Sequence, residues 1–127
     1  MIVKITNMYS EDHGLQVSFQ SLFSKGLAAW VGGPPQIGQE YDIEMTLDET
    51  FCWGENIKPS ANNIDLFYTV KGKTHLTAEL ISTDDDKCAA IRLYGLIILI
   101  ELDRMPEEKP SHIDLTTTQI HLYPTEL

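Results

Sequence analysis

The chain has 127 residues, of which 43% are hydrophobic, so we expect a single domain spanning residues 1–127 with a core of its own. Nineteen Asp and Glu oppose nine Lys and Arg, giving a formal net charge of −10 at pH 7. Charge of this sign repels nucleic-acid backbones and anionic membrane surfaces, which argues against both as partners and favours a basic protein.

The cysteines indicate the compartment. Cys52 and Cys88 are the only two and form no CxxC motif. The N-terminal segment Met1–Thr6 lacks the basic and apolar regions of a secretory signal. The longest apolar run, Leu96–Ile100, is too short to span a bilayer. We therefore expect a cytoplasmic protein with two free, reduced thiols.

In the first half of the chain, Met1–Met8 predicts a first strand. Segment Leu15–Trp30 fits two patterns. Its first apolar residues alternate as in a strand, and the later ones follow the spacing of a helix. We favour a strand and then one short turn of helix. Residues Tyr41–Asp48 alternate apolar and polar side chains without exception, which predicts a half-buried strand.

Two hairpins follow in chain order. Ile64–Val70 and Thr74–Thr83 flank the turn residues 71–73, and Cys88–Tyr94 and Leu96–Leu102 flank a glycine. The last of these segments is apolar on both faces. We therefore expect it to be either a central strand that is covered on both sides or a barrel strand.

The final segment, His112–Tyr123, changes the parity of its apolar positions between Leu115 and Ile120. This change predicts a bulge or a break near Thr117–Thr118. In total, about seven mostly antiparallel strands with turns between them predict an all-β fold, either a sandwich or a partly open barrel of the OB type.

Motifs for catalysis or metal binding are absent from the sequence. There is no Gly-x-Ser-x-Gly elbow, and neither cysteine has protease-like surroundings. Aromatic and acidic neighbours of Cys52 should raise the pKa of its thiol, which makes it a poor nucleophile. The histidines show no HxH or HExxH spacing, and Asp84–Asp86 lacks the spacing of a calcium loop. We therefore predict no catalytic residue, no metal site and no cofactor, and a protein that is not an enzyme.

A binding surface is predicted from segment 39–55, which holds six carboxylates and no Lys or Arg. Three of the acids share the outer face of the predicted strand, and the loop after them carries Phe51 and Trp53. Carboxylates steer a basic partner, and aromatic rings supply desolvated contact. The predicted partner-binding residues are Asp42, Glu44, Asp48, Glu49, Trp53 and Glu55.

The C-terminal third carries a resemblance to a known class of proteins. Through Ala89–Ile100, Ile113–Leu115 and Ile120–Pro124 the chain resembles bacterial immunity proteins of contact-dependent inhibition and other polymorphic toxin systems. The resemblance implies a non-enzymatic inhibitor that binds a cognate toxin domain, commonly a basic nuclease, and covers its active site or substrate groove. The net charge of −10 fits such a role independently, as a mimic of nucleic acid.

Two other functions stay open. A small-ligand or carbohydrate-binding β module would carry its site on loops, with Trp30 and Trp53 stacking on a sugar or base. An accessory subunit would associate stably with larger machinery. The sequence also leaves the oligomeric state open between a monomer and a small homo-oligomer.

Overall fold

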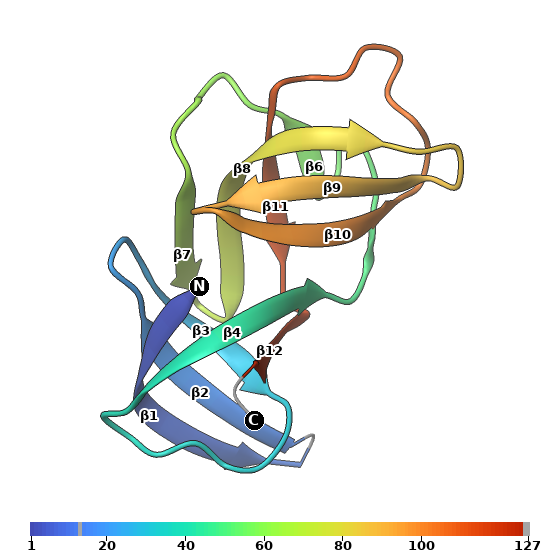
Figure 1. Ribbon diagram of the computed structural model, residues 1–127. Helices are drawn as coiled ribbons and strands as arrows, with labels where there is room; N and C mark the ends of the chain where they lie inside the picture. The colour runs from blue at the N-terminus through green and yellow to red at the C-terminus, as the bar shows by residue number, and fades with distance from the viewer. Residues whose placement is uncertain (13, 126–127) are drawn as a thin grey trace.

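The computed structural model describes residues 1–12 and 14–125, and these form twelve strands and no helix (Figure 1). The all-β prediction is confirmed, but the short helix expected within 15–30 is wrong. That segment forms a hairpin of β2 (Gly14–Gln20) and β3 (Lys25–Trp30). The hairpin turn is closed by a hydrogen bond from the Ser21 N–H to the Ser24 carbonyl, at 2.7 Å. Two of the residues that suggested a helical face, Leu22 and Phe23, are exposed in this turn.

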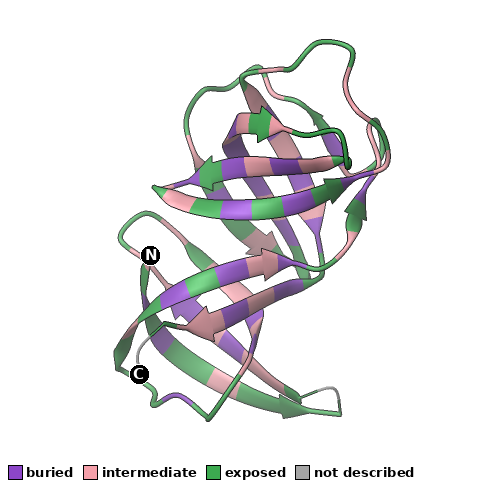
Figure 2. Cartoon of the chain, turned by 45° about the vertical axis from the view of Figure 1, so that its right-hand side comes forward, coloured by how far each residue is buried: buried purple, intermediate pink, exposed green. Residues whose placement is uncertain are grey.

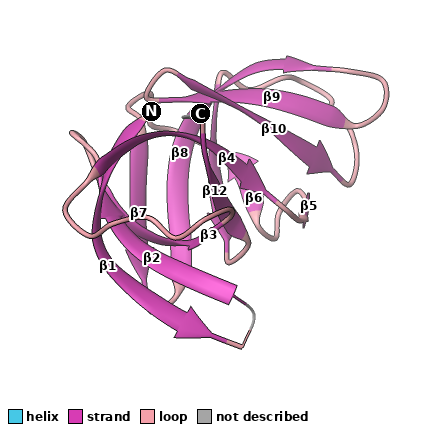
Figure 3. Cartoon of the chain, turned by 60° about the horizontal axis from the view of Figure 1, so that its bottom comes forward, coloured by secondary structure: helices cyan, strands magenta, loops and turns pink. Residues whose placement is uncertain are grey.

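Five strands form a closed barrel, rather than the partly open one considered above. Its order is β1, β2, β3, β12, β4, and β4 pairs again with β1. In Figure 3 these strands curve around one another. The bounds not yet given are Ile2–Glu11 for β1, Glu40–Leu47 for β4 and Ile120–Pro124 for β12. The buried apolar side chains of the barrel strands are Val3, Ile5, Val17, Phe19, Ala28, Trp30, Ile43, Met45, Leu47, Ile120 and Leu122.

Residues 50–117 form a second, seven-stranded sheet between β4 and β12 of the barrel. Its order is β5, β10, β9, β8, β11, β6, and β7 pairs with the first part of β8. Twelve strands therefore replace the seven that we expected. The bounds are Thr50–Phe51 for β5, Ile57–Pro59 for β6, Leu66–Val70 for β7, Lys73–Thr83 for β8, Cys88–Leu93 for β9, Leu96–Leu102 for β10 and His112–Thr117 for β11.

The predicted break near Thr117–Thr118 is where the chain passes from one sheet to the other. β11 pairs with β8 and β6 in the seven-stranded sheet, whereas β12 pairs with β4 and β3 in the barrel. The parity of the apolar positions changes because the two strands face different parts of the core. In the link between β11 and β12, the Gln119 N–H donates a hydrogen bond to Thr117 Oγ1, at 3.1 Å.

Barrel and sheet share one cluster of buried apolar side chains. Phe19 of β2 and Phe67 of β7 meet in this cluster, with ring centroids 5.7 Å apart. Gly26 lies against both rings, because a Cβ there would be 2.4 Å from Phe67 Cε1 and 2.9 Å from Phe19 Cζ. Next to it, the Leu27 N–H donates to Thr69 Oγ1 at 3.2 Å. The glycine therefore permits the close approach of β3 and β7.

β10 does not have the two covered faces that its composition suggested. Ile98, Ile100 and Leu102 are buried, but Ile97 is 50% exposed and Leu99 is 72% exposed. Figure 2 shows this alternation along the strand. The prediction fails because only one face of β10 packs on the core, and the other face, with Ile97, Leu99 and Glu101, is open to solvent.

Candidate functional site

The outer face of β4 carries the acidic row that the sequence predicted. Asp42 and Glu44 are exposed, and the alternate residues Ile43 and Met45 are buried inside the barrel. Asp48 follows directly after the strand and is also exposed. The regular alternation of the segment therefore places these three carboxylates on the surface of the barrel.

The three carboxylates differ in their partners. Asp42 Oδ1 accepts a hydrogen bond from the Met1 amino group at 3.0 Å, and this contact lowers the pKa of the Asp42 carboxyl. Asp48 Oδ2 lies 2.7 Å from His121 Nδ1 on the neighbouring strand β12. Among residues 1–12 and 14–125, Glu44 has no ion-pair partner. Glu44 is therefore the member of the row whose charge is fully available.

The remaining predicted residues lie in the β5–β6 region and have mainly structural contacts. Glu49 accepts hydrogen bonds from Asn56 Nδ2, at 3.3 Å, and from Thr117 Oγ1. Trp53 is half-buried, and its indole N–H donates to the Arg104 carbonyl at 3.0 Å. Glu55 is exposed in the turn that follows. The structure thus separates Glu55 and Trp53 from the acidic row of β4.

Of the two aromatic residues expected beside the acids, one is buried and the other is half-buried. Phe51 is fully buried, and the ring of Trp53 packs against the core. Ile97 and Leu99 of β10 are exposed instead. The sequence contains one signal for them, because Glu101 has the same parity along the strand and marks that face as open to water.

Acidic and apolar surfaces meet in a groove between the end of β4 and the end of β10, which we call the junction groove. It has a volume of about 520 Å³. Asp48, Glu49 and Glu101 supply carboxylates, and Leu99 supplies exposed apolar surface. None of the described residues that line it is a Lys or an Arg. The full lining is Thr46, Leu47, Asp48, Glu49, Thr50, Cys88, Leu99, Ile100 and Glu101.

The two cysteines lie near this groove but are poor nucleophiles. Burial is the main cause that raises the pKa of both thiols, and nearby carboxylates add to it: Asp103 at Cys52 and Asp84 at Cys88. Both cysteines are free. Cys88 begins β9 and Cys52 directly follows β5, and β10 lies between these two strands. The two Cα atoms are therefore at least about two strand spacings, roughly 10 Å, apart, which is beyond the reach of a disulfide.

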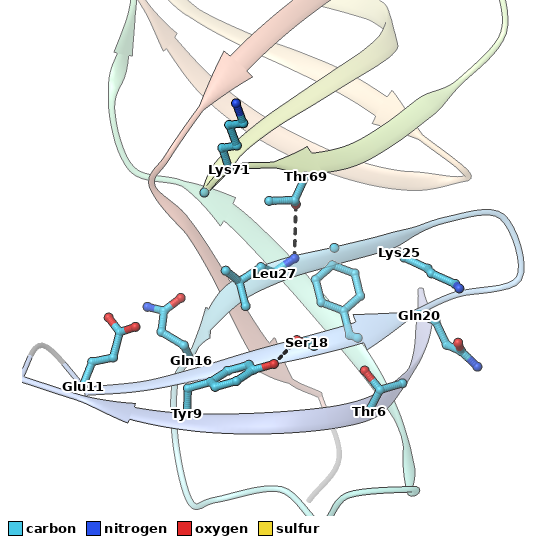
Figure 4. Close-up of a pocket in the computed structure, with 13 residues that line it drawn as sticks. Thr6, Tyr9, Glu11, Gln16, Ser18, Gln20, Lys25, Leu27, Thr69 and Lys71 are labelled. Carbon is cyan, nitrogen blue, oxygen red and sulfur yellow. Dashed lines mark hydrogen bonds between the residues drawn. The ribbon is translucent and has the colours of Figure 1, made fainter.

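A second hollow lies on the barrel itself, below the β7–β8 hairpin (Figure 4). This barrel groove has a volume of about 740 Å³ and differs from the junction groove in charge, since it contains Lys25 and Lys71 and a single carboxylate, Glu11. Its aromatic residues are Tyr9 and Phe19, and the Tyr9 hydroxyl accepts a hydrogen bond from Ser18 Oγ at 3.2 Å. Polar side chains from β1, β2 and β3 point into it, as Figure 4 shows.

The described part of the chain contains no group of three or more His, Cys, Asp or Glu side chains that could hold a metal ion. Within residues 1–12 and 14–125, no helix is long and apolar enough to cross a membrane. No protein-family model matches the chain, and comparisons with curated proteins and with solved structures found no match.

Proposed function

We propose that this chain is a non-enzymatic, cytoplasmic immunity protein that binds and neutralises a basic, nuclease-type toxin domain. The observation that carries the proposal is the junction groove, which is lined by three carboxylates and the exposed side chain of Leu99. Tight protein interfaces combine charge that steers the partner with apolar side chains that lose their water on contact. The junction groove offers both within one surface.

The distribution of charge supports a basic partner. The net charge is −10, and the outer face of β4 adds Glu44 to the carboxylates of the junction groove. A field of this sign accelerates association with a basic protein and imitates the phosphates that a nuclease binds. We therefore place the centre of the interface at Glu44, Asp48, Glu101 and Leu99.

The residues predicted from the sequence have different roles in this proposal. Asp48 and Glu44 remain contact residues, and Asp42 contributes less because the Met1 amino group neutralises it. Glu49 and Trp53 hold the β5–β6 region in place through their hydrogen bonds. Glu55 lies at the periphery. Glu101 and Leu99 take the place of the expected aromatic contacts.

The test is affinity capture from the cell that encodes the chain, with the wild-type protein and with a Glu44→Lys, Glu101→Lys variant as baits. We expect a stoichiometric basic polypeptide on the wild-type bait, released by high salt and missing from the variant. That polypeptide should arrest growth when it is expressed alone, and co-expression of this chain should restore growth. A captured polypeptide that is harmless to the cell would contradict the immunity function.

The barrel groove favours a second candidate, a module that binds a small polar ligand such as a saccharide. Its size and its polar lining suit such a ligand. The tryptophans first considered as stacking platforms do not reach it, because Trp30 is 5% exposed and donates its indole N–H to the Gly33 carbonyl at 2.8 Å. Chemical-shift changes at Tyr9 and Lys71 in a saccharide titration would support this candidate, and unchanged spectra would exclude the saccharides tested.

A further inference from the structure

The barrel groove has a polar floor that is made by alternate side chains of one strand. Gln16, Ser18 and Gln20 of β2 line the groove and are half-buried, and the residues between them, Val17 and Phe19, are buried. Alternate side chains of a strand repeat about every 6.6–7 Å, so these three cover about 14 Å. The floor is therefore long enough for a ligand of several linked units.

The wall and the roof of the groove are fixed by hydrogen bonds within the protein. Tyr9 of β1 is 42% exposed, and its hydroxyl accepts hydrogen bonds from Asn7 Nδ2 and Ser18 Oγ, both at 3.2 Å. On the other side, Thr69 of the β7–β8 hairpin accepts the Leu27 N–H of β3. Because these contacts exist in the free protein, the groove is formed before a ligand binds, which lowers the cost of binding.

The two ends of the groove differ in charge. Figure 4 shows Glu11 at one end and Lys25 at the other. Lys25 is exposed and has no ion-pair partner among residues 1–12 and 14–125. In the strand register, Gln20 lies between Lys25 and Lys4, and Glu40 lies on the far side of Lys4. Two cations and one carboxylate therefore leave a positive charge at this end, in a molecule whose net charge is −10.

The chemistry of the lining selects among classes of ligand. The amides and hydroxyls of the floor both donate and accept hydrogen bonds, as the hydroxyls of a sugar do. A nucleic acid requires cations along the whole of its backbone, and the side chain of Lys71 points away from the floor in Figure 4. An extended peptide finds no backbone to pair with, because β1 and β3 are bonded to the two sides of β2.

We propose that the barrel groove binds a short acidic oligosaccharide, with sugar hydroxyls along Gln16, Ser18 and Gln20 and a carboxylate beside Lys25. The exposed ring of Tyr9 supplies apolar surface for one sugar ring. This inference rests on the second candidate function, because it specifies the ligand of that module. The site uses β1, β2 and β3, whereas the junction groove uses β4 and β10, so the two sites occupy different strands.

A titration with two defined sugars tests the inference. The probe is the linear trimer of galacturonic acid, and the control is the neutral trimer of galactose. Amide spectra of the labelled protein should show shifts at Gln16, Ser18 and Gln20 with both trimers. The acidic trimer should bind about tenfold more tightly at low salt, because a hydrogen bond to a charged group is stronger than one between neutral groups.

Two substitutions isolate the contacts. Lys25→Gln should weaken binding of the acidic trimer about tenfold and leave the neutral trimer unchanged. Lys109→Gln is the matched control, since it removes the same charge from the exposed loop after β10. Tyr9→Leu should weaken both trimers about fivefold, because the ring contacts a sugar whatever its charge. Amide spectra without sugar would verify that each variant keeps the fold.

The outcomes separate the inference from the second candidate function. Equal affinity for the two trimers, or equal weakening by Lys25→Gln and Lys109→Gln, would overturn the acidic ligand and leave a saccharide-binding module standing. Unchanged spectra with both trimers would overturn the inference and contradict that candidate as well. A third probe, a peptide in which glutamate and serine alternate, should bind at least tenfold more weakly than the acidic trimer. Equal binding would show that the groove selects charge rather than sugar, which also overturns the inference.

Discussion

The barrel and the seven-stranded sheet expose different kinds of surface. Every barrel strand has a neighbour on both sides, so the barrel can offer a partner only its side chains, of which the row on β4 is acidic. The sheet is open, and β10 exposes the apolar side chains of Ile97 and Leu99 on its outer face. Closing a sheet removes its edges, and an open sheet keeps them. The candidate interface lies where the acidic face of the barrel meets the exposed outer face of β10.

The largest expected effect is on the free energy of unfolding, when the contact between the barrel and the sheet is weakened. Phe67→Ala removes the ring that packs on Phe19 across the barrel–sheet contact. Loss of a buried phenyl ring should lower the free energy of unfolding by about 3–5 kcal/mol. Urea denaturation followed by circular dichroism measures this loss, and Ile37→Ala, at a side chain that is 55% exposed on a barrel loop, is the control. Equal stability of the two variants would show that Phe67 does not join the regions.

A smaller loss is expected from crowding the same contact. Gly26→Ala would place a Cβ within 3 Å of both phenyl rings, so the rings or β3 must shift. Overpacking of this kind should lower the free energy of unfolding by about 1–3 kcal/mol. Combining it with Phe67→Leu should cost less than the sum of the two single changes, and strict additivity in the denaturation curves would contradict the proposed contact.

The regular elements could be predicted from the sequence because their local patterns and their tertiary environment agree. The alternation of Tyr41–Leu47 matches β4. The hairpin turns at Lys71-Gly72 and Tyr94-Gly95 need positive φ angles, which both residues of each turn adopt. The exposure of Ile97 and Leu99 could not be predicted, because a strand that is apolar on both faces does not reveal which face the rest of the chain covers. Local sequence does not reveal which strand lies beside another.

Only part of the predicted site matches the structure, because local alternation places the acids on the surface but does not identify their partners. The acids of β4 face outward as their alternation requires, but their partners come from distant parts of the chain. Asp42 meets the Met1 amino group, and Asp48 meets His121, which is opposite Thr46 in the register of β12 with β4. These pairings depend on how the barrel closes, which the acidic segment alone does not specify.

A third prediction concerns the exposed side chain of Leu99 on β10 and its part in binding the partner. Leu99→Ser should weaken binding of the captured partner by about tenfold, because Leu99 is the exposed apolar side chain of the junction groove. Its effect on the free energy of unfolding should stay within about 0.5 kcal/mol, since the side chain is 72% exposed. Ile37→Ser, on a barrel loop, is the control and should leave binding unchanged. Calorimetric titration of the three proteins measures the difference.

The smallest expected effect concerns the thiols beside the groove. Burial and neighbouring carboxylates disfavour the thiolates of Cys52 and Cys88 and raise the pKa of both above the usual value of about 8.5. Alkylation by iodoacetamide at pH 7 should therefore be slower than that of glutathione and should accelerate as the pH rises beyond 9. Mass spectrometry over time gives both rates, and faster alkylation than glutathione at pH 7 would contradict the assigned environment.

The central claim is that the carboxylates at the meeting point of barrel and sheet attract a basic partner. The most direct measurement is the association rate of the captured partner, at low and high salt, with the wild type and with the Glu44→Lys, Glu101→Lys variant. A Glu107→Lys, Glu108→Lys variant is the control, because it changes the net charge equally in the exposed loop after β10. We predict that the first variant associates about tenfold more slowly at low salt, that the control is slowed much less, and that high salt removes the difference. Equal slowing by both variants would contradict the claim, because it would show that only the net charge matters.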